Sequence, residues 1–210
     1  MVRVLALDVD GVLLDGDRRG EGHWSIELAR RFEIERSRLR AHFFAPPWHD
    51  IVTGRKPIEP ALHEALERIG SDVSVEQVLD CWFEADFVPI EPAFEFARSI
   101  AATGVEVVLA TNQEHRRATY LRARIGARLE LGDVLSSAAL GVEKSDPAFF
   151  DLASARLGVS DRSDVVFVDD TLGNVEVARS CGWHAIHAVD DHSWIRAVRA
   201  VRRSAGWPGF

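Results

Sequence analysis

The sequence of 210 residues contains only two cysteines, Cys81 and Cys181. Two cysteines are too few for a disulfide framework, and their wide separation does not suit a paired zinc site. Each lies in an apolar segment with a helical pattern, which favours a reduced thiol that packs as a small hydrophobic residue. The sequence therefore excludes a small fold that depends on disulfide bonds.

Long apolar runs and an excess of basic charge are also missing. No run approaches the roughly 20 apolar residues that a membrane-spanning helix needs, and charge interrupts residues 1–8 too early for a secretory signal. The formal net charge of −8 disfavours nucleic acid or an anionic membrane as the main partner. With 47% hydrophobic and 28% charged residues, the composition is that of a soluble globular protein, and we expect a cytoplasmic location.

Short apolar runs alternate with helical patterns over much of the chain. The β-branched run 2–9 is typical of a strand that is buried on both faces, as in a parallel sheet. Similar runs occur at 105–110, 134–136, 165–168 and 184–188, and helical patterns at 116–125, 147–157 and 175–180. The alternation predicts an α/β fold, a Rossmann-like doubly wound parallel sheet with right-handed crossovers.

One long stretch breaks this alternation. Between His23 and Phe87 only helical patterns occur, at 24–32, 37–44, 60–69 and 75–86. We therefore predict a catalytic core made of residues 1–14 and 92–210, and a helical cap domain, preceded by a flap, over residues 15–91. Within this insertion, Trp48 and His49 follow two prolines, and we expect them in an irregular loop that can face the catalytic edge of the sheet.

Polar side chains follow four of the predicted strands. They are Asp8 and Asp10 after the first strand, Thr111 and Asn112 after the second, Lys144 after the third, and Asp169 and Asp170 after the fourth. Ligands of an open parallel sheet bind outside the carboxyl ends of the strands. We therefore expect these side chains to meet at one edge.

The chemistry of this set is that of phosphoryl transfer. Asp8 can attack a phosphate as the nucleophile, and Asp10 can protonate the leaving alcohol and later deprotonate water. Phosphate would contact Asp8 and three further residues, namely Thr111, Asn112 and Lys144. Mg²⁺ prefers carboxylates and substrate oxygens, so the predicted metal ligands are the four aspartates Asp8, Asp10, Asp169 and Asp170.

Four segments resemble the motifs of the haloacid dehalogenase (HAD) superfamily, in the same order. They are residues 8–12, 110–112, 141–147 and 167–174, and the insertion stands where that superfamily places its helical C1 cap. The resemblance implies a Mg²⁺-dependent phosphatase that acts on a small phosphate ester through an aspartyl-phosphate. The dehalogenase branch lacks an acidic residue two positions after the nucleophile, so Asp10 favours the phosphatase branch. Residues 54–56 are similar to a cap segment of sugar-phosphate phosphatases.

Three alternatives remain open from the sequence. The first is a phosphomutase, which uses the same core. The second, less favoured, is a 2-haloacid dehalogenase. The third is a regulatory protein without activity, which would be expected to have lost the nucleophile or a metal-binding carboxylate. The sequence leaves the physiological substrate and the oligomeric state undetermined.

Overall fold

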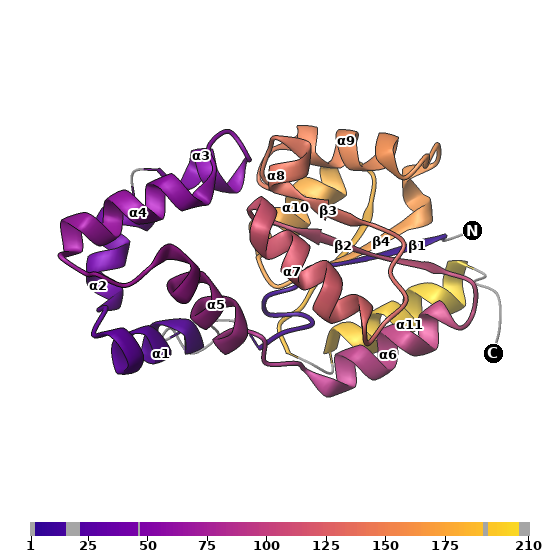
Figure 1. Ribbon diagram of the computed structural model, residues 1–210. Helices are drawn as coiled ribbons and strands as arrows, with labels where there is room; N and C mark the ends of the chain where they lie inside the picture. Colours follow the sequence, from indigo (N-terminus) through magenta and orange to yellow (C-terminus); the bar gives the residue numbers. More distant parts are fainter. Residues whose placement is uncertain (1–2, 16–21, 46, 191–192, 206–210) are drawn as a thin grey trace.

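The computed structural model describes residues 3–15, 22–45, 47–190 and 193–205. Its centre is a parallel sheet in the order β3-β2-β1-β4-β5 (Figure 1). The strands are β1 (Val4–Leu7), β2 (Glu106–Thr111), β3 (Val134–Ser136), β4 (Val165–Asp169) and β5 (His184–His187). This is the predicted Rossmann-like α/β fold, and each strand lies within two residues of its predicted place.

Helices cover both faces of the sheet because successive side chains of a buried strand point to opposite faces. Leu5 and Leu7 of β1 belong to a cluster with α6 (Glu91–Ala101), α7 (His115–Gly126) and α11 (Ser193–Ala205). Val4 and Ala6 point the other way, toward α9 (Pro147–Arg156) and α10 (Leu172–Ser180). The short helix α8 (Ser137–Leu140) follows β3 directly.

The first strand lies in the middle of the sheet. Leu7, its last residue, pairs with Leu109 of β2 on one side and with Val168 of β4 on the other. All three strands run in the same direction, so their carboxyl ends lie side by side. The register therefore places Asp8 between the polar residues that follow β2 and β4.

The described residues between β1 and α6 form a separate group of helices, which we call the helical insertion. It contains α1 (His23–Phe32), α2 (Arg36–Leu39), the π-helical turn η1 (Arg40–Phe44), α3 (Trp48–Val52), α4 (Ile58–Ile69) and α5 (Val75–Ala85). Figure 1 shows the insertion beside the edge at which β1 ends. It is thus placed to cover the carboxyl ends of the strands.

The insertion has its own core, rich in aromatic rings. Phe43 and Trp82 are almost completely buried, and Phe44 and Trp48 pack against them. The ring centroids of Phe44 and Trp82 are 5.5 Å apart, and those of Phe44 and Trp48 are 5.0 Å apart in an edge-on arrangement. This cluster joins helices that are distant in sequence, and it gives the insertion a core independent of the sheet.

Some elements differ from the sequence prediction. Helix α6 was not predicted because Pro92 marked a break, but proline is tolerated in the first turn of a helix, where no backbone N–H bond is lost. Trp48 and His49 begin helix α3, so the prediction of an irregular loop there was wrong. The predicted helix 37–44 starts at Arg36 and changes to a π-helical turn at Arg40. The predicted flap falls largely on residues 16–21, outside the described residues.

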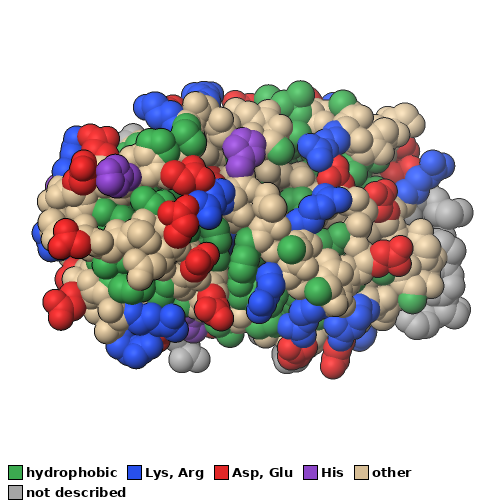
Figure 2. Space-filling view, in the orientation of Figure 1, with side chains coloured by type: hydrophobic (Ala, Val, Ile, Leu, Met, Phe, Trp, Pro, Cys, Tyr) green, Lys and Arg blue, Asp and Glu red, His purple; other side chains and the backbone are tan. Residues whose placement is uncertain are grey.

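The surface agrees with the mixed charge of the sequence. On the face seen in Figure 2, acidic and basic side chains are intermixed over both the insertion and the core. No helix in the described part of the chain is long and apolar enough to cross a bilayer.

Candidate active site

Asp8 stands immediately after the central strand and is 7% exposed. Its Oδ1 accepts a hydrogen bond from the backbone N–H of Val9 and lies 2.8 Å from Nζ of Lys144. Burial raises the pKa of Asp8 to about 7, against the attraction of Lys144, which lowers it. The carboxylate is thus held in a site that needs positive charge to keep it ionised.

Lys144 reaches the centre of the site from the segment between α8 and α9. It is 2% exposed, and its Nζ also lies 2.7 Å from Oδ2 of Asp169. Burial draws the pKa of Lys144 down, but the two carboxylates outweigh this and hold its pKa above the ordinary value. Lys144 therefore remains charged and joins the ends of β1 and β4.

Asp169, the last residue of β4, is completely buried. Besides Lys144, its carboxylate accepts hydrogen bonds from the backbone N–H of Thr171 and from the amide of Asn174 at 3.1 Å. Both oxygens of Asp169 are therefore occupied by donors from the protein. Asp169 and Asp8 thus hold Nζ of Lys144 between them.

Asp170 projects into the site beside Gly11. Gly11 has a φ of +78°, and a Cβ placed there would collide with the carboxylate of Asp170. Only glycine combines this backbone conformation with such a close approach. Carboxylate oxygens of Asp8, Asp169 and Asp170 all lie within 4.8 Å of one another. A group of carboxylates at this spacing fits a hard divalent cation such as Mg²⁺.

The remaining predicted residues line the same hollow. Thr111 ends β2 and is buried, and Oδ1 of Asn112 accepts the backbone N–H of Lys144 at 2.9 Å. The hollow is a cavity of about 290 Å³, which we call the sheet-edge cavity. It is lined by Asp8, Asp10, Gly11, Thr111, Asn112, Gln113, Lys144, Asp170, Thr171 and Asn174. Six of the seven predicted site residues line this cavity, and the seventh, Asp169, lies beneath it against Lys144.

The side chain of Asp10 is held by two residues that the sequence analysis did not identify. Arg117 Nη2 donates to Oδ1 of Asp10 at 2.8 Å, and the amide of Gln113 donates to Oδ2 at 2.7 Å. Gln113 lies two residues before α7 and Arg117 is the third residue of that helix, so both belong to the segment that follows β2. Their place directly after the second predicted strand was visible in the sequence, but no local pattern linked Arg117 to Asp10.

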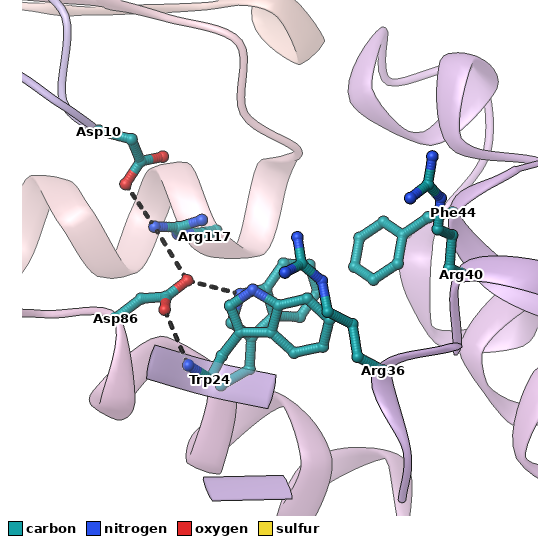
Figure 3. A pocket seen from close by; sticks show the side chains of 8 residues that line it. Asp10, Trp24, Arg36, Arg40, Phe44, Asp86 and Arg117 are labelled. Carbon is teal, nitrogen blue, oxygen red and sulfur yellow. Dashed lines mark hydrogen bonds and ion pairs between the residues drawn. The ribbon is translucent and has the colours of Figure 1, made fainter. Parts of the chain in front are cut away.

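Arg117 also connects the site to the helical insertion. It is 3.7 Å from Oδ2 of Asp86, which follows α5. Asp86 in turn accepts the backbone N–H of Trp24 at 3.1 Å and the indole N–H of Trp82 at 2.9 Å. Figure 3 shows this chain of contacts from Asp10 through Arg117 and Asp86 into the insertion.

A second cavity of about 320 Å³ lies along this chain, and we call it the insertion cavity. It is lined by Asp10, Trp24, Arg36, Arg40, Phe44, Trp82, Asp86 and Arg117. Asp10 is therefore shared by the two cavities, at the point where they meet. Across the insertion cavity from Asp10 stand Arg36, Arg40 and Phe44 (Figure 3).

Two other segments singled out in the sequence lie outside both cavities. Arg55 and Lys56 pair with Asp50, with 2.8 Å between Lys56 and the carboxylate. His49 approaches the site only indirectly, because its Nδ1 lies 2.6 Å from the carboxylate of Glu143, the neighbour of Lys144. His49 thereby links the insertion to the core, while Arg55 and Lys56 pair within the insertion, and none of the three lines either cavity.

Comparison with solved structures shows the same fold. A predicted HAD-like family hydrolase from Porphyromonas gingivalis superposes with a TM-score of 0.75 at 22% identity, over 97% of this chain and 98% of that one. A HAD family enzyme from Bacteroides thetaiotaomicron, in complex with magnesium and inorganic phosphate, has a TM-score of 0.70 at 18% identity, over 93% and 99% of the two chains. The L-2-haloacid dehalogenase from Xanthobacter autotrophicus reaches 0.64 at 19% identity, over 96% and 83%.

No curated protein sequence matches this chain. A model of the haloacid dehalogenase-like hydrolases, in contrast, matches residues 2–182, which include the sheet edge and the whole helical insertion. The chain therefore belongs to the haloacid dehalogenase-like hydrolases.

Proposed function

We propose that this hydrolase is a Mg²⁺-dependent phosphatase that acts on a small phosphomonoester through a phosphorylated Asp8. The observation that carries the proposal is the charge balance of the sheet-edge cavity. Asp8, Asp169 and Asp170 bring three carboxyl groups together in and beneath this cavity, Lys144 supplies one positive charge, and Asp10 is paired with Arg117, so acidic groups are in excess. A phosphate dianion cannot approach this group closely without further positive charge.

Asp8 and Asp170 are the residues that we expect to hold the cation, because Asp169 already accepts bonds from Lys144, Thr171 and Asn174. When bound, Mg²⁺ would offset the charge of these carboxylates and of the phosphate oxygens. In this proposal Asp169 acts through Lys144, whose ammonium group it orients.

The reaction then takes place in two steps on the residues of the chain. A carboxylate oxygen of Asp8 attacks phosphorus, and the bond from phosphorus to the alcohol oxygen breaks while Asp10 gives that oxygen a proton. Water next attacks the phosphorus of the aspartyl-phosphate while Asp10 takes a proton from the water. The bond between phosphorus and the Asp8 oxygen then breaks, which releases inorganic phosphate and restores the Asp8 carboxylate. Thr111, Asn112 and Lys144 surround the transferred phosphoryl group.

The position of Asp10 supports this assignment over dehalogenation. It lies between the two cavities, so it can face the phosphorus on one side and the leaving oxygen on the other. The helical insertion would act as the cap, excluding water from the sheet edge during transfer. The reduced Cys81 and Cys181 are compatible with the cytoplasmic location that we expect.

The test is phosphate release from p-nitrophenyl phosphate, with Mg²⁺ and with EDTA. We expect activity that requires Mg²⁺ and falls by at least about 10³-fold in Asp8→Asn. Asp151→Asn, which changes an exposed carboxylate that lines neither cavity, is the matched control and retains activity. Full activity in Asp8→Asn would exclude the nucleophile, and release of halide from a 2-haloacid in EDTA would favour a dehalogenase instead.

A further inference from the structure

The position and the volume of the insertion cavity indicate where the leaving group of the substrate would bind. Because it meets the sheet-edge cavity at Asp10, it extends from the point where the leaving oxygen receives its proton. Its volume of about 320 Å³ is at the lower end of the range of small-molecule sites, about 300–1,000 Å³. The leaving group of a small ester would therefore occupy this cavity while the phosphoryl group occupies the other.

The charges that line the insertion cavity are unevenly matched. Its two carboxylates, Asp10 and Asp86, both pair with Arg117, at 2.8 Å and 3.7 Å. Arg36 and Arg40 line the opposite wall. Over the described part of the chain, no carboxylate forms an ion pair with Arg40. Arg40 therefore contributes a positive charge to the wall that faces Asp10.

Arg36 and Arg40 lie on the same side of one helical segment. Arg36 begins α2 and Arg40 begins the π-helical turn that follows, so the two side chains are four positions apart and share one side of the helix. The guanidinium of Arg36 stands over the ring of Trp24, 5.9 Å from its centroid, and Phe44 lies next to Arg40 in the cavity wall. The wall thus combines two guanidinium groups with aromatic surface.

We infer that the substrate carries a second anionic group, a carboxylate or a second phosphate, on its leaving group, and that Arg40 with Arg36 binds it. This inference rests on the proposed phosphatase activity and adds the class of substrate. Guanidinium groups bind carboxylate and phosphate oxygens through paired charge-assisted hydrogen bonds, which an uncharged alcohol cannot replace. The carbon body that joins this anion to the scissile phosphate would occupy the insertion cavity, whose volume of about 320 Å³ limits it to a small group.

The experiment compares substrates that differ only in the second anion. For the carboxylate, 3-phosphoglycerate is compared with glycerol 3-phosphate; for the phosphate, propane-1,3-diol bisphosphate is compared with propyl phosphate. We expect the anionic member of at least one pair to have a kcat/KM at least about tenfold higher. The pair that shows the preference identifies the anion.

The variant Arg40→Gln then tests the residue. It is expected to lower kcat/KM for the anionic substrate about tenfold more than for its uncharged counterpart, chiefly through KM. Arg68→Gln, an exposed arginine of α4 that pairs with Glu64, is the control and should keep the wild-type ratio. Melting temperatures of both variants check that they are folded.

The outcomes separate this inference from the proposed function. Equal kcat/KM within both pairs, or a preference that persists in Arg40→Gln, would overturn the inference, while release of phosphate from p-nitrophenyl phosphate would leave the phosphatase proposal standing. A protein that hydrolyses no phosphate ester under any of these conditions would overturn both.

Discussion

The two cavities that meet at Asp10 are built in different ways. The sheet-edge cavity is formed by the ends of β1, β2 and β4 and the segment of Lys144, and its charged groups pair with one another in the interior. The insertion cavity is formed mainly by helices of the insertion, and its wall combines aromatic rings with arginines. The first has the groups for chemistry on phosphate, and the second has the shape and charge for recognising what carries it.

The difference follows from how each part is held together. The sheet fixes the backbone at its strand ends by a continuous hydrogen-bond ladder, and ion pairs such as that of Lys144 with Asp169 then hold the side chains placed there. The insertion is held by an aromatic cluster and by a few contacts with the core, such as the bond from Ser137 Oγ to the carbonyl of Val52. The residues that line a site for the leaving group can change more easily in the helical insertion than at the ends of the strands.

The largest effect on stability is expected from removing Lys144. Lys144→Ala leaves Asp8 and Asp169 buried without their counter-charge, which costs about 3–5 kcal/mol of unfolding free energy. We expect phosphatase activity to fall about 10²–10³-fold as well. Denaturant unfolding in EDTA and initial rates with Mg²⁺ measure the two losses.

The sequence supplies a matched control, because Lys56 is its only other lysine. Lys56 forms an exposed ion pair with Asp50 in the insertion, so Lys56→Ala should change stability by less than about 1 kcal/mol. Similar losses in the two variants would contradict the contrast between an interior charge network and a solvated surface.

The second largest effect is expected from Mg²⁺, which should stabilise the protein through the sheet-edge cavity and not through the insertion cavity. At a Mg²⁺ concentration about 100 times its Kd, the folded state gains about 2.7 kcal/mol, because the unfolded chain lacks the site. Thermal melts with Mg²⁺ and with EDTA measure this gain, and we expect Asp170→Asn to lose most of it. Arg40→Gln should keep it, since Arg40 lines only the insertion cavity. A gain that survives in Asp170→Asn would place the cation elsewhere.

Arg117 is the residue that joins the two cavities, and its removal should affect both. Arg117→Gln deprives Asp10 and Asp86 of a charged partner, and we expect a loss of about 1–3 kcal/mol in stability. Because Asp10 would lose the group that positions it, kcat should fall about tenfold or more while KM changes less. Arg122→Gln, on the exposed side of the same helix, is the control for α7. A change in KM alone would show that Arg117 serves the insertion cavity only.

The smallest effect is expected at Trp82. Trp82→Phe keeps an aromatic ring but removes the indole N–H that donates to Asp86, at a cost of about 1–2 kcal/mol. Trp183→Phe removes an equivalent N–H bond, to Ser154, within the core. Both variants should lose similar stability in denaturant unfolding, but only Trp82→Phe should also change KM, since Trp82 lines the insertion cavity. Equal kinetics in the two would weaken the assignment of that cavity to the leaving group.

Much of the fold and of the sheet edge could be predicted from local sequence. An apolar β-branched run that stops at Asp8, and another that stops at Asp169, already indicate where buried strands end. Parallel pairing then brings the following residues to one edge, and the structure brings all seven predicted residues there. Their roles in catalysis stay predictions until they are tested.

Other features could not be predicted because they depend on residues distant in sequence. Arg117 contacts Asp10, which is 107 positions earlier, and a single arginine in a helix gives no sign of that contact. Likewise the sequence gives no direction for Arg36 and Arg40. Their direction depends on how the insertion sits on the core, where Gly54 approaches the carbonyl of Ala138 so closely that a Cβ would lie 2.5 Å from its oxygen.

The sequence by itself thus determined the places of the five strands along the chain, the nucleophile candidate Asp8 and the set of charged groups around it. These follow from periodicity and from residues next to strand ends, which are local properties of the chain. Only the tertiary structure decided that Asp10 lies between two cavities and that Arg40 faces one of them. Such placements arise from packing between separate elements, and the physical reason is that a side chain's partners are set by how those elements dock.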